Sequence, residues 1–150
     1  MTRYLLDTDI ISNITMPIPS KPLISWMAEQ ADDDLFVASV VVGEVWLGVL
    51  QSPKGKRRAQ LENWFTGTDG PRALFRNRIL PFDEKASMIW GRLMSDGSRL
   101  GHRRSPLDMI VAAVAEANDC VVVTDNEKGL CRLEFHQSLA SSIVRIAWDA

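Results

Sequence analysis

The chain has 150 residues, of which 46% are hydrophobic and 24% are charged, and its formal net charge at pH 7 is -2. We expect a single domain over residues 1–150, without a membrane-spanning run of about 20 apolar residues or a secretory signal, and therefore a cytoplasmic protein. The slightly acidic balance argues against coating of nucleic acid by bulk charge, so any such binding must come from local patches.

The first half of the chain alternates short apolar runs with helical patterns. In chain order these patterns predict a strand over 3–7, a helix over 10–14, a helix over 23–29, a turn at 32–34, a strand over 35–38, a helix from a Ser39 cap to residue 50 and a helix over 56–65. Three prolines, Pro17, Pro19 and Pro22, separate the first two helices, because proline fixes φ and removes a backbone donor.

The second half continues this alternation. It predicts a loop at 70–71, a short strand or edge segment over 79–81, a helix over 83–99, a helix from a Ser105 cap to residue 118, a strand over 121–124, a short helical segment over 124–127 and a strand over 143–146. The helix after Ser105 is almost uniformly apolar from Met109 to Ala115, so it must be buried on several sides. Strands that alternate with helices indicate an α/β fold with a mostly parallel sheet covered on both faces.

Four acidic residues stand where apolar runs end. They are Asp7 after the first strand, Glu44 early in the helix after the second strand, Asp108 early in the buried helix, and Asp125 after the strand at 121–124. Because the carboxyl ends of parallel strands meet along one edge of a sheet, these carboxylates can converge there. Hard divalent cations would relieve their repulsion and activate water against a phosphodiester. The pattern therefore predicts a metal-dependent nuclease.

Each acidic residue also has a purely structural interpretation. An aspartate near a helix N-terminus satisfies free N–H groups and complements the helix dipole, and Asp108, three residues after Ser105, is the clearest such case. Glu44 lies in an apolar run, where an ionised side chain without a partner is costly, so its structural alternative is a buried salt bridge.

The joint pattern resembles the PIN domain family over nearly the whole chain. Its four motifs are matched by Leu5–Asp9, Gly43–Gly48, Asp108–Ala113 and Val123–Asn126, and Arg78–Asp83 further resembles the VapC and FitB branch of bacterial toxins. Each motif is short and weak alone, but their order and spacing together are specific. The resemblance implies a PIN-like three-layer α/β/α sandwich with a mostly parallel central sheet.

The resemblance also implies a function, that of a metal-dependent endoribonuclease and toxin in a type II toxin–antitoxin pair. Such a protein hydrolyses RNA with Mg2+ or Mn2+, is held inactive by a cognate antitoxin and usually forms a homodimer. By position, the implied catalytic and metal-binding residues are Asp7, Glu44, Asp108 and Asp125, supported by Thr8, Thr124 and Asn126.

Two positions depart from the family pattern. The register of the fourth motif places Asn126, not Asp125, at the usual site position, so both remain candidates. Asp9 stands where many relatives have asparagine. Its added negative charge either alters metal affinity, or its carboxylate simply forms a local hydrogen bond.

Two basic runs are candidates for RNA binding. The first, directly ahead of the buried helix, contains Arg99, His102, Arg103 and Arg104. Their cations would project near the mouth of the site, and phosphate contact or a solvated loop are the two interpretations. The second run, within residues 54–58, stands at a predicted helix start where acids would suit the dipole better, and this misfit favours a binding role.

Two other functions fit parts of the sequence. The Asp-x-Asp formed by Asp7 and Asp9 is suited to a haloacid-dehalogenase-like phosphatase, although Ile11 replaces the next expected Thr or Val and no clear lysine motif precedes Asp125. The other is a catalytically inactive PIN module that binds RNA or protein, and retention of the acidic residues argues against it.

Overall fold

Within the residues that the computed structural model describes, which are 2–15, 18–101, 103–125 and 143–145, five strands form one sheet. The strands are β1 (Arg3–Leu6), β2 (Leu35–Ala38), β3 (Ile79–Leu80), β4 (Cys120–Thr124) and β5 (Ile143–Arg145). Their order is β3-β2-β1-β4-β5, and every neighbouring pair is parallel. The carboxyl ends of the strands therefore lie at one edge, and the predicted parallel sheet is confirmed.

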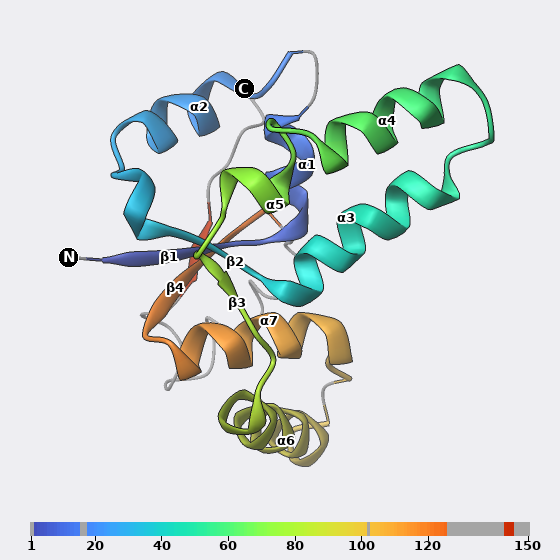
Figure 1. Ribbon diagram of the computed structural model, residues 1–150. Helices are drawn as coiled ribbons and strands as arrows, with labels where there is room; N and C mark the ends of the chain where they lie inside the picture. Colours follow the sequence, from blue (N-terminus) through green and yellow to red (C-terminus); the bar gives the residue numbers. More distant parts are fainter. Residues whose placement is uncertain (1, 16–17, 102, 126–142, 146–150) are drawn as a thin grey trace.

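Helices cover both faces of this sheet. Those in the described ranges are α1 (Thr8–Ile14), α2 (Lys21–Ala28), α3 (Ser39–Gln51), α4 (Lys56–Thr66), α5 (Pro71–Leu74), α6 (Glu84–Arg99) and α7 (Pro106–Ala117), with a 3-10 turn over Asp32–Asp34. Figure 1 shows α6 and α7 on one side of the sheet and α1 to α5 on the other. The predicted three-layer α/β/α sandwich is confirmed. None of these described helices is long and apolar enough to span a membrane.

The hydrophobic core lies between the sheet and the two helical layers. In β1, Leu5 and Leu6 are fully buried, since both faces of a parallel strand are covered by helices. In α7, Met109 and the run Val111–Ala115 are buried, because this helix packs against β4 on one side and α6 on the other (Figure 1). The prediction that this helix is buried on several sides is confirmed.

Two helices begin at residues other than those predicted, because their caps differ. The Asp7 carboxylate accepts the Thr8 N–H, so α1 begins at Thr8 and not at residue 10. Ser39 was predicted to cap α3, and this is wrong: Ser39 is its first helical residue. The N-cap is Ala38, the last residue of β2, which offers no side-chain hydrogen bond. The strand passes directly into the helix and leaves no residue between them to act as a side-chain cap.

Proline explains two further differences. The predicted loop at 70–71 instead opens the short helix α5, because Pro71 fits a first turn, where its missing N–H is not needed. Likewise α2 begins at Lys21 and contains Pro22 in its first turn. The predicted strand at 143–146 is present as β5, while its last residue and the predicted helical segment beyond Asp125 lie outside the described residues.

Replacing Gly70 by alanine is expected to destabilise the fold. A Cβ at this buried position would lie 2.2 Å from the carbonyl oxygen of Phe65 and 2.6 Å from that of Trp64. Backbone atoms cannot rotate away, so we expect the free energy of unfolding to fall by about 1–3 kcal/mol. Gly91→Ala in α6 is the control, because nothing lies within 4 Å of its Cβ, and it should stabilise by up to about 1 kcal/mol. Chemical denaturation measures both, and an unchanged Gly70→Ala would contradict this packing.

Candidate active site

Asp7 occupies the first position beyond β1 and is held there by three hydrogen bonds. Its N–H donates to the Val123 carbonyl at 3.0 Å, which extends the connection between β1 and β4. Its Oδ1 accepts the Thr8 N–H at 2.8 Å, and its Oδ2 accepts the Thr124 hydroxyl at 2.9 Å. Asp7 is only 6% exposed and Thr124 is fully buried. The Asp7 carboxylate is therefore fixed at the carboxyl edge of the sheet.

Glu44 reaches the same site from α3. The Thr8 hydroxyl donates to Glu44 Oε1 at 2.9 Å, so Thr8 bonds to Asp7 through its main chain and to Glu44 through its side chain. Glu44 is half-buried, and none of the ion pairs found among the described residues includes it, so the buried salt bridge that is its structural alternative has no support there.

Asp108 enters the site from the first turn of α7. As predicted, Ser105 is the N-cap of this helix, and its Oγ accepts the Asp108 N–H at 3.3 Å. The cap explains where α7 begins. The cap does not explain why the charge of Asp108 raises the pKa values of Asp7 and Glu44. That effect requires the three carboxylates to lie near one another.

The ionisation of these carboxylates is coupled. Burial is the largest cause that raises the pKa of Asp7 from 3.8 to about 6, followed by the negative charge of Asp9, and Asp108 adds a smaller contribution. The hydrogen bonds from Thr8 and Thr124 oppose this rise. Burial also raises the pKa of Glu44, and the charges of Asp7 and Asp108 raise it further. The structure thus brings three of the predicted acidic residues into one site.

Asp125 lies immediately beyond β4, at the same edge of the sheet. Its N–H donates to Asp9 Oδ2 at 2.7 Å, so Asp9 and Asp125 are in direct contact. Asn126, the other candidate for the fourth position, lies outside the described residues. Asp9 was not among the predicted site residues, although its place two residues after Asp7 puts it in the same turn. The sequence pattern that indicated it was the Asp-x-Asp spacing.

The donor set suits a hard divalent cation by its chemistry. Carboxylate oxygens are the ligands that Mg2+ and Mn2+ prefer, and a cation would offset the repulsion that raises the pKa values of Asp7 and Glu44. As placed here, no group of three or more acidic, histidine or cysteine side chains in the described part of the chain could hold an ion. The carboxylates would have to draw together around a cation.

Arg104, one of the predicted RNA-binding residues, is committed to a structural contact. Its Nη1 donates to the Leu93 carbonyl of α6 at 2.6 Å. Its aliphatic portion covers Gly97, where an added Cβ would lie 2.6 Å from Arg104 Cδ. This half-buried side chain therefore ties the segment before α7 to α6.

The other members of that basic run are placed differently. Arg99 forms an ion pair with Asp96, one turn earlier in α6. Arg103 is exposed, and His102 lies outside the described residues. Among the described members of this run, Arg103 is therefore the one whose side chain is exposed and forms no ion pair with another described residue.

Removing the Thr124 hydroxyl is expected to destabilise the protein. Thr124→Val keeps the shape of the side chain but takes a donor from the buried Asp7 carboxylate, and a hydrogen bond to a charged group contributes about 1.5–3 kcal/mol. The free energy of unfolding near neutral pH should fall by about this amount, and the pKa of Asp7 should rise further because the bond favours the ionised form. Thr124→Ser, which keeps the hydroxyl, is the control. Equal losses in both variants, measured by denaturation, would assign the effect to packing.

The fold and the site together define a class of α/β protein. Its parallel sheet gathers interacting carboxylates just beyond β1, in the second turn of α3 and in the first turn of α7, and the Asp9 carboxylate accepts a main-chain N–H just beyond β4. Hydroxyl groups of neighbouring threonines hold two of these carboxylates in place.

Known proteins of the same kind identify the family. Residues 4–136 match the PIN domain. The chain is 31% identical over 120 residues to the toxin FitB of Neisseria gonorrhoeae, covering 80% of this chain and 85% of FitB. It is also 31% identical over 120 residues to the VapC ribonuclease Y4jK of Sinorhizobium fredii, covering 80% and 84%. The crystal structure of FitAcB from Neisseria gonorrhoeae matches with a TM-score of 0.80 at 26% identity, over 98% of this chain and 99% of that chain. The chain belongs to the PIN domain family, in the group of the FitB and VapC toxins.

Proposed function

We propose that this chain is a metal-dependent endoribonuclease that acts in the cytoplasm as the toxin of a type II toxin–antitoxin pair. The observation that carries the proposal is the set of interacting carboxylates Asp7, Glu44 and Asp108 at the carboxyl edge of the sheet. The relatives support it, since one is a toxin and the other a VapC ribonuclease.

The acidic residues would bind the metal and manage the proton of the attacking water. Mg2+ or Mn2+ would be held by Asp7, Glu44 and Asp108, with Asp125 or Asn126 as the fourth residue. When bound, such an ion lowers the pKa of a water molecule and offsets charge that develops on the phosphate. Either Glu44 or Asp125 would accept the proton, and burial supports Glu44 by raising its pKa and hence its basicity.

The threonines would keep these carboxylates in position during the reaction. The Thr124 hydroxyl holds Asp7 Oδ2, and the Thr8 hydroxyl holds Glu44 Oε1. Because both donors are already aligned, they would keep Asp7 and Glu44 oriented while the carboxylates draw together around the cation. This is the supporting role that the sequence predicted for Thr8 and Thr124.

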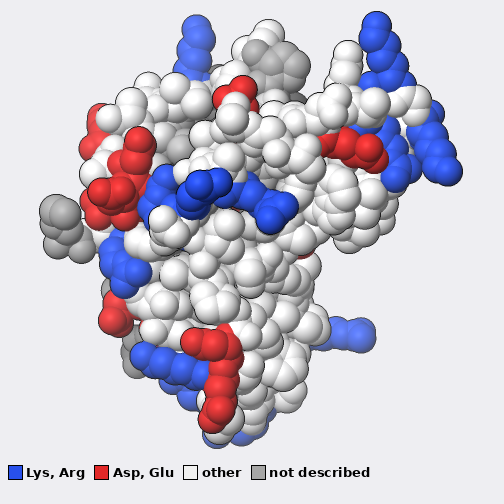
Figure 2. Space-filling model, viewed as in Figure 1, with Lys and Arg blue, Asp and Glu red and all other residues white. Residues whose placement is uncertain are grey.

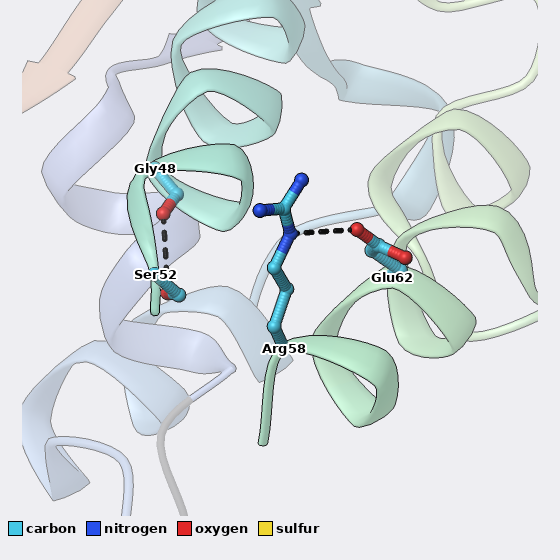
Figure 3. A network of polar contacts seen from close by, with 4 residues as sticks. All are labelled: Gly48, Ser52, Arg58 and Glu62. Atoms are coloured by element: carbon cyan, nitrogen blue, oxygen red, sulfur yellow. Dashed lines mark hydrogen bonds and ion pairs between the residues drawn. The ribbon is translucent and has the colours of Figure 1, made fainter. Parts of the chain in front are cut away.

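Basic side chains at the turn between α3 and α4 offer contacts to RNA phosphates. The cations within residues 54–57 are exposed, and Figure 2 shows basic side chains gathered at the upper right, where Figure 1 draws this turn. Arg58 differs, since its Nε donates to Glu62 at 2.9 Å within α4 (Figure 3). Glu44 lies nearer the other end of α3, so RNA bound at the turn would run along α3 toward the site.

The proposed toxin requires a cognate antitoxin, and we expect the toxin itself to be a homodimer. FitB, a relative named as a toxin, supports the first of these expectations. Expression of the chain alone should arrest growth, and co-expression of an antitoxin should restore it and yield a stable complex on purification. Growth unaffected by the chain alone would contradict the toxin assignment.

Mapping of cleavage sites on total cellular RNA tests the proposed activity. The wild-type chain with Mg2+ or Mn2+ should produce discrete new 5′ ends, and Asp108→Asn should produce none. Asp108→Asn retains the main-chain N–H that Ser105 accepts, so the start of α7 should be preserved. RNA binding without cleavage with either metal would favour the inactive module.

The phosphatase alternative is less compatible with the relatives and with the sequence. Residues 4–136 match the PIN domain, and Ile11 stands where such a phosphatase would have Thr or Val. Phosphatase turnover with a phosphoryl group trapped on Asp7, and no RNA cleavage, would reverse this ranking.

A further inference from the structure

Asp9 connects two segments that are far apart in the sequence. Its Oδ2 accepts the Asp125 N–H at 2.7 Å, across a separation of 116 positions. Its Oδ1 accepts the N–H of its neighbour Ile10 at 2.9 Å. Asp9 and Asp125 are both half-buried, so their contact is partly shielded from water.

This contact continues the connection between β1 and β4 beyond the end of the sheet. The Asp7 N–H donates to the Val123 carbonyl, and the Asp7 carboxylate accepts the Thr124 hydroxyl. Both strands have ended by the next position, and there the Asp9 carboxylate takes the Asp125 N–H. A side chain therefore replaces a backbone acceptor at the point where Asp125 leaves the sheet.

The bond to Asp125 requires an acceptor oxygen at position 9. Each oxygen of Asp9 accepts a different backbone N–H. The Ile10 N–H also donates to the Asp7 carbonyl at 3.1 Å, so it does not depend on Asp9 alone. Asparagine keeps one acceptor oxygen, which can still accept the Asp125 N–H, whereas alanine has none.

We propose that Asp9 is a positioning residue that fixes the main chain at Asp125 and thereby sets how the Asp125 side chain enters the site. The inference rests on the proposed function, because Asp125 matters only as a member of a catalytic carboxylate set. Asp9 acts through its bond to Asp125 and not through its charge alone.

Hydrogen exchange of the Asp125 amide, measured by NMR on the metal-free protein, tests the bond itself. Asp9→Ala should speed exchange at Asp125 by about tenfold or more because it removes the acceptor, whereas Asp9→Asn, which keeps one acceptor oxygen, should retain most of the protection. The Asp7 amide, whose acceptor is the Val123 carbonyl, should keep its protection in the same spectra. Unchanged exchange at Asp125 in Asp9→Ala would overturn the proposal.

A double-mutant cycle tests whether Asp9 acts through Asp125. Asp9→Ala and Asp125→Ala should each lower kcat for RNA cleavage by about tenfold with little change in KM, and the double variant should be no slower than Asp125→Ala alone. Additive losses would show that Asp9 acts independently and would overturn the proposal. So would full activity of Asp125→Ala.

Asp83→Ala is the matched control. The Asp83 Oδ1 accepts the Ala86 N–H at 3.0 Å as the cap of α6, at an exposed position outside the site. This variant loses a comparable hydrogen bond and should keep the wild-type cleavage rate. A wild-type protein that fails to cleave RNA would contradict the proposed function. The bond between Asp9 and Asp125 would still be tested by exchange at the Asp125 amide, because hydrogen exchange does not depend on activity.

Discussion

Replacing Asp7 by asparagine is expected to reduce RNA cleavage by about a thousandfold or more while leaving the fold intact. Asparagine keeps an oxygen that can accept the Thr8 N–H, and its amide can donate to the Thr124 oxygen in place of the present bond. It removes the negative charge that metal binding requires. The measurement is the initial rate of RNA cleavage with Mg2+ and with Mn2+.

Asp33→Asn is a suitable control for this variant. Asp33 is an exposed member of the turn before β2 and lies outside the candidate site, so the same chemical change should leave the cleavage rate unchanged. If Asp7→Asn cut RNA at the wild-type rate, the proposed carboxylate mechanism would be wrong.

Local sequence rules were sufficient for most elements and for the core of the site. The alternation of apolar runs with helical patterns predicted the layers, and Asp7, Glu44 and Asp108 were predicted as neighbours because each lies just beyond a strand or early in a helix at the same edge of the sheet. The strand order itself depends on packing over the whole chain. No local pattern states that β1 lies between β2 and β4.

The contacts that sequence reasoning missed are those made across long separations. Asp9 bonds to a main-chain N–H 116 positions away. Because every residue type except proline has a main-chain N–H, no sequence pattern predicts which one a side chain will bond. Arg104 was assigned to RNA because it is a cation beside the site. Its placement follows from the space that Gly97 leaves on α6 and from the Leu93 carbonyl, which only the packed fold brings together.

Asp7→Asn is also expected to raise the free energy of unfolding of the metal-free protein by about 2–3 kcal/mol near neutral pH. Burial, mainly, raises the pKa of Asp7 from 3.8 to about 6, which means that the folded protein disfavours the ionised side chain that it holds at pH 7. Asparagine is neutral and removes this cost. The residue that the proposed chemistry needs is thus one that the fold would be more stable without, and such opposition is expected at active sites.

The pH dependence of this difference provides the decisive measurement. Because the folded pKa of Asp7 is raised, its contribution to stability is fully present below about pH 3.8 and is lost as the pH rises through about 6. The two proteins should therefore have similar stabilities near pH 4, diverge between pH 4 and 6, and differ by a constant amount above about pH 7. Urea denaturation of both proteins in the presence of a chelator measures the difference. A difference in stability that stays constant from pH 4 to 7 would show that ionisation of Asp7 does not oppose folding. The expected divergence would show that the folded protein loses stability by holding an ionised carboxylate at the centre of this site.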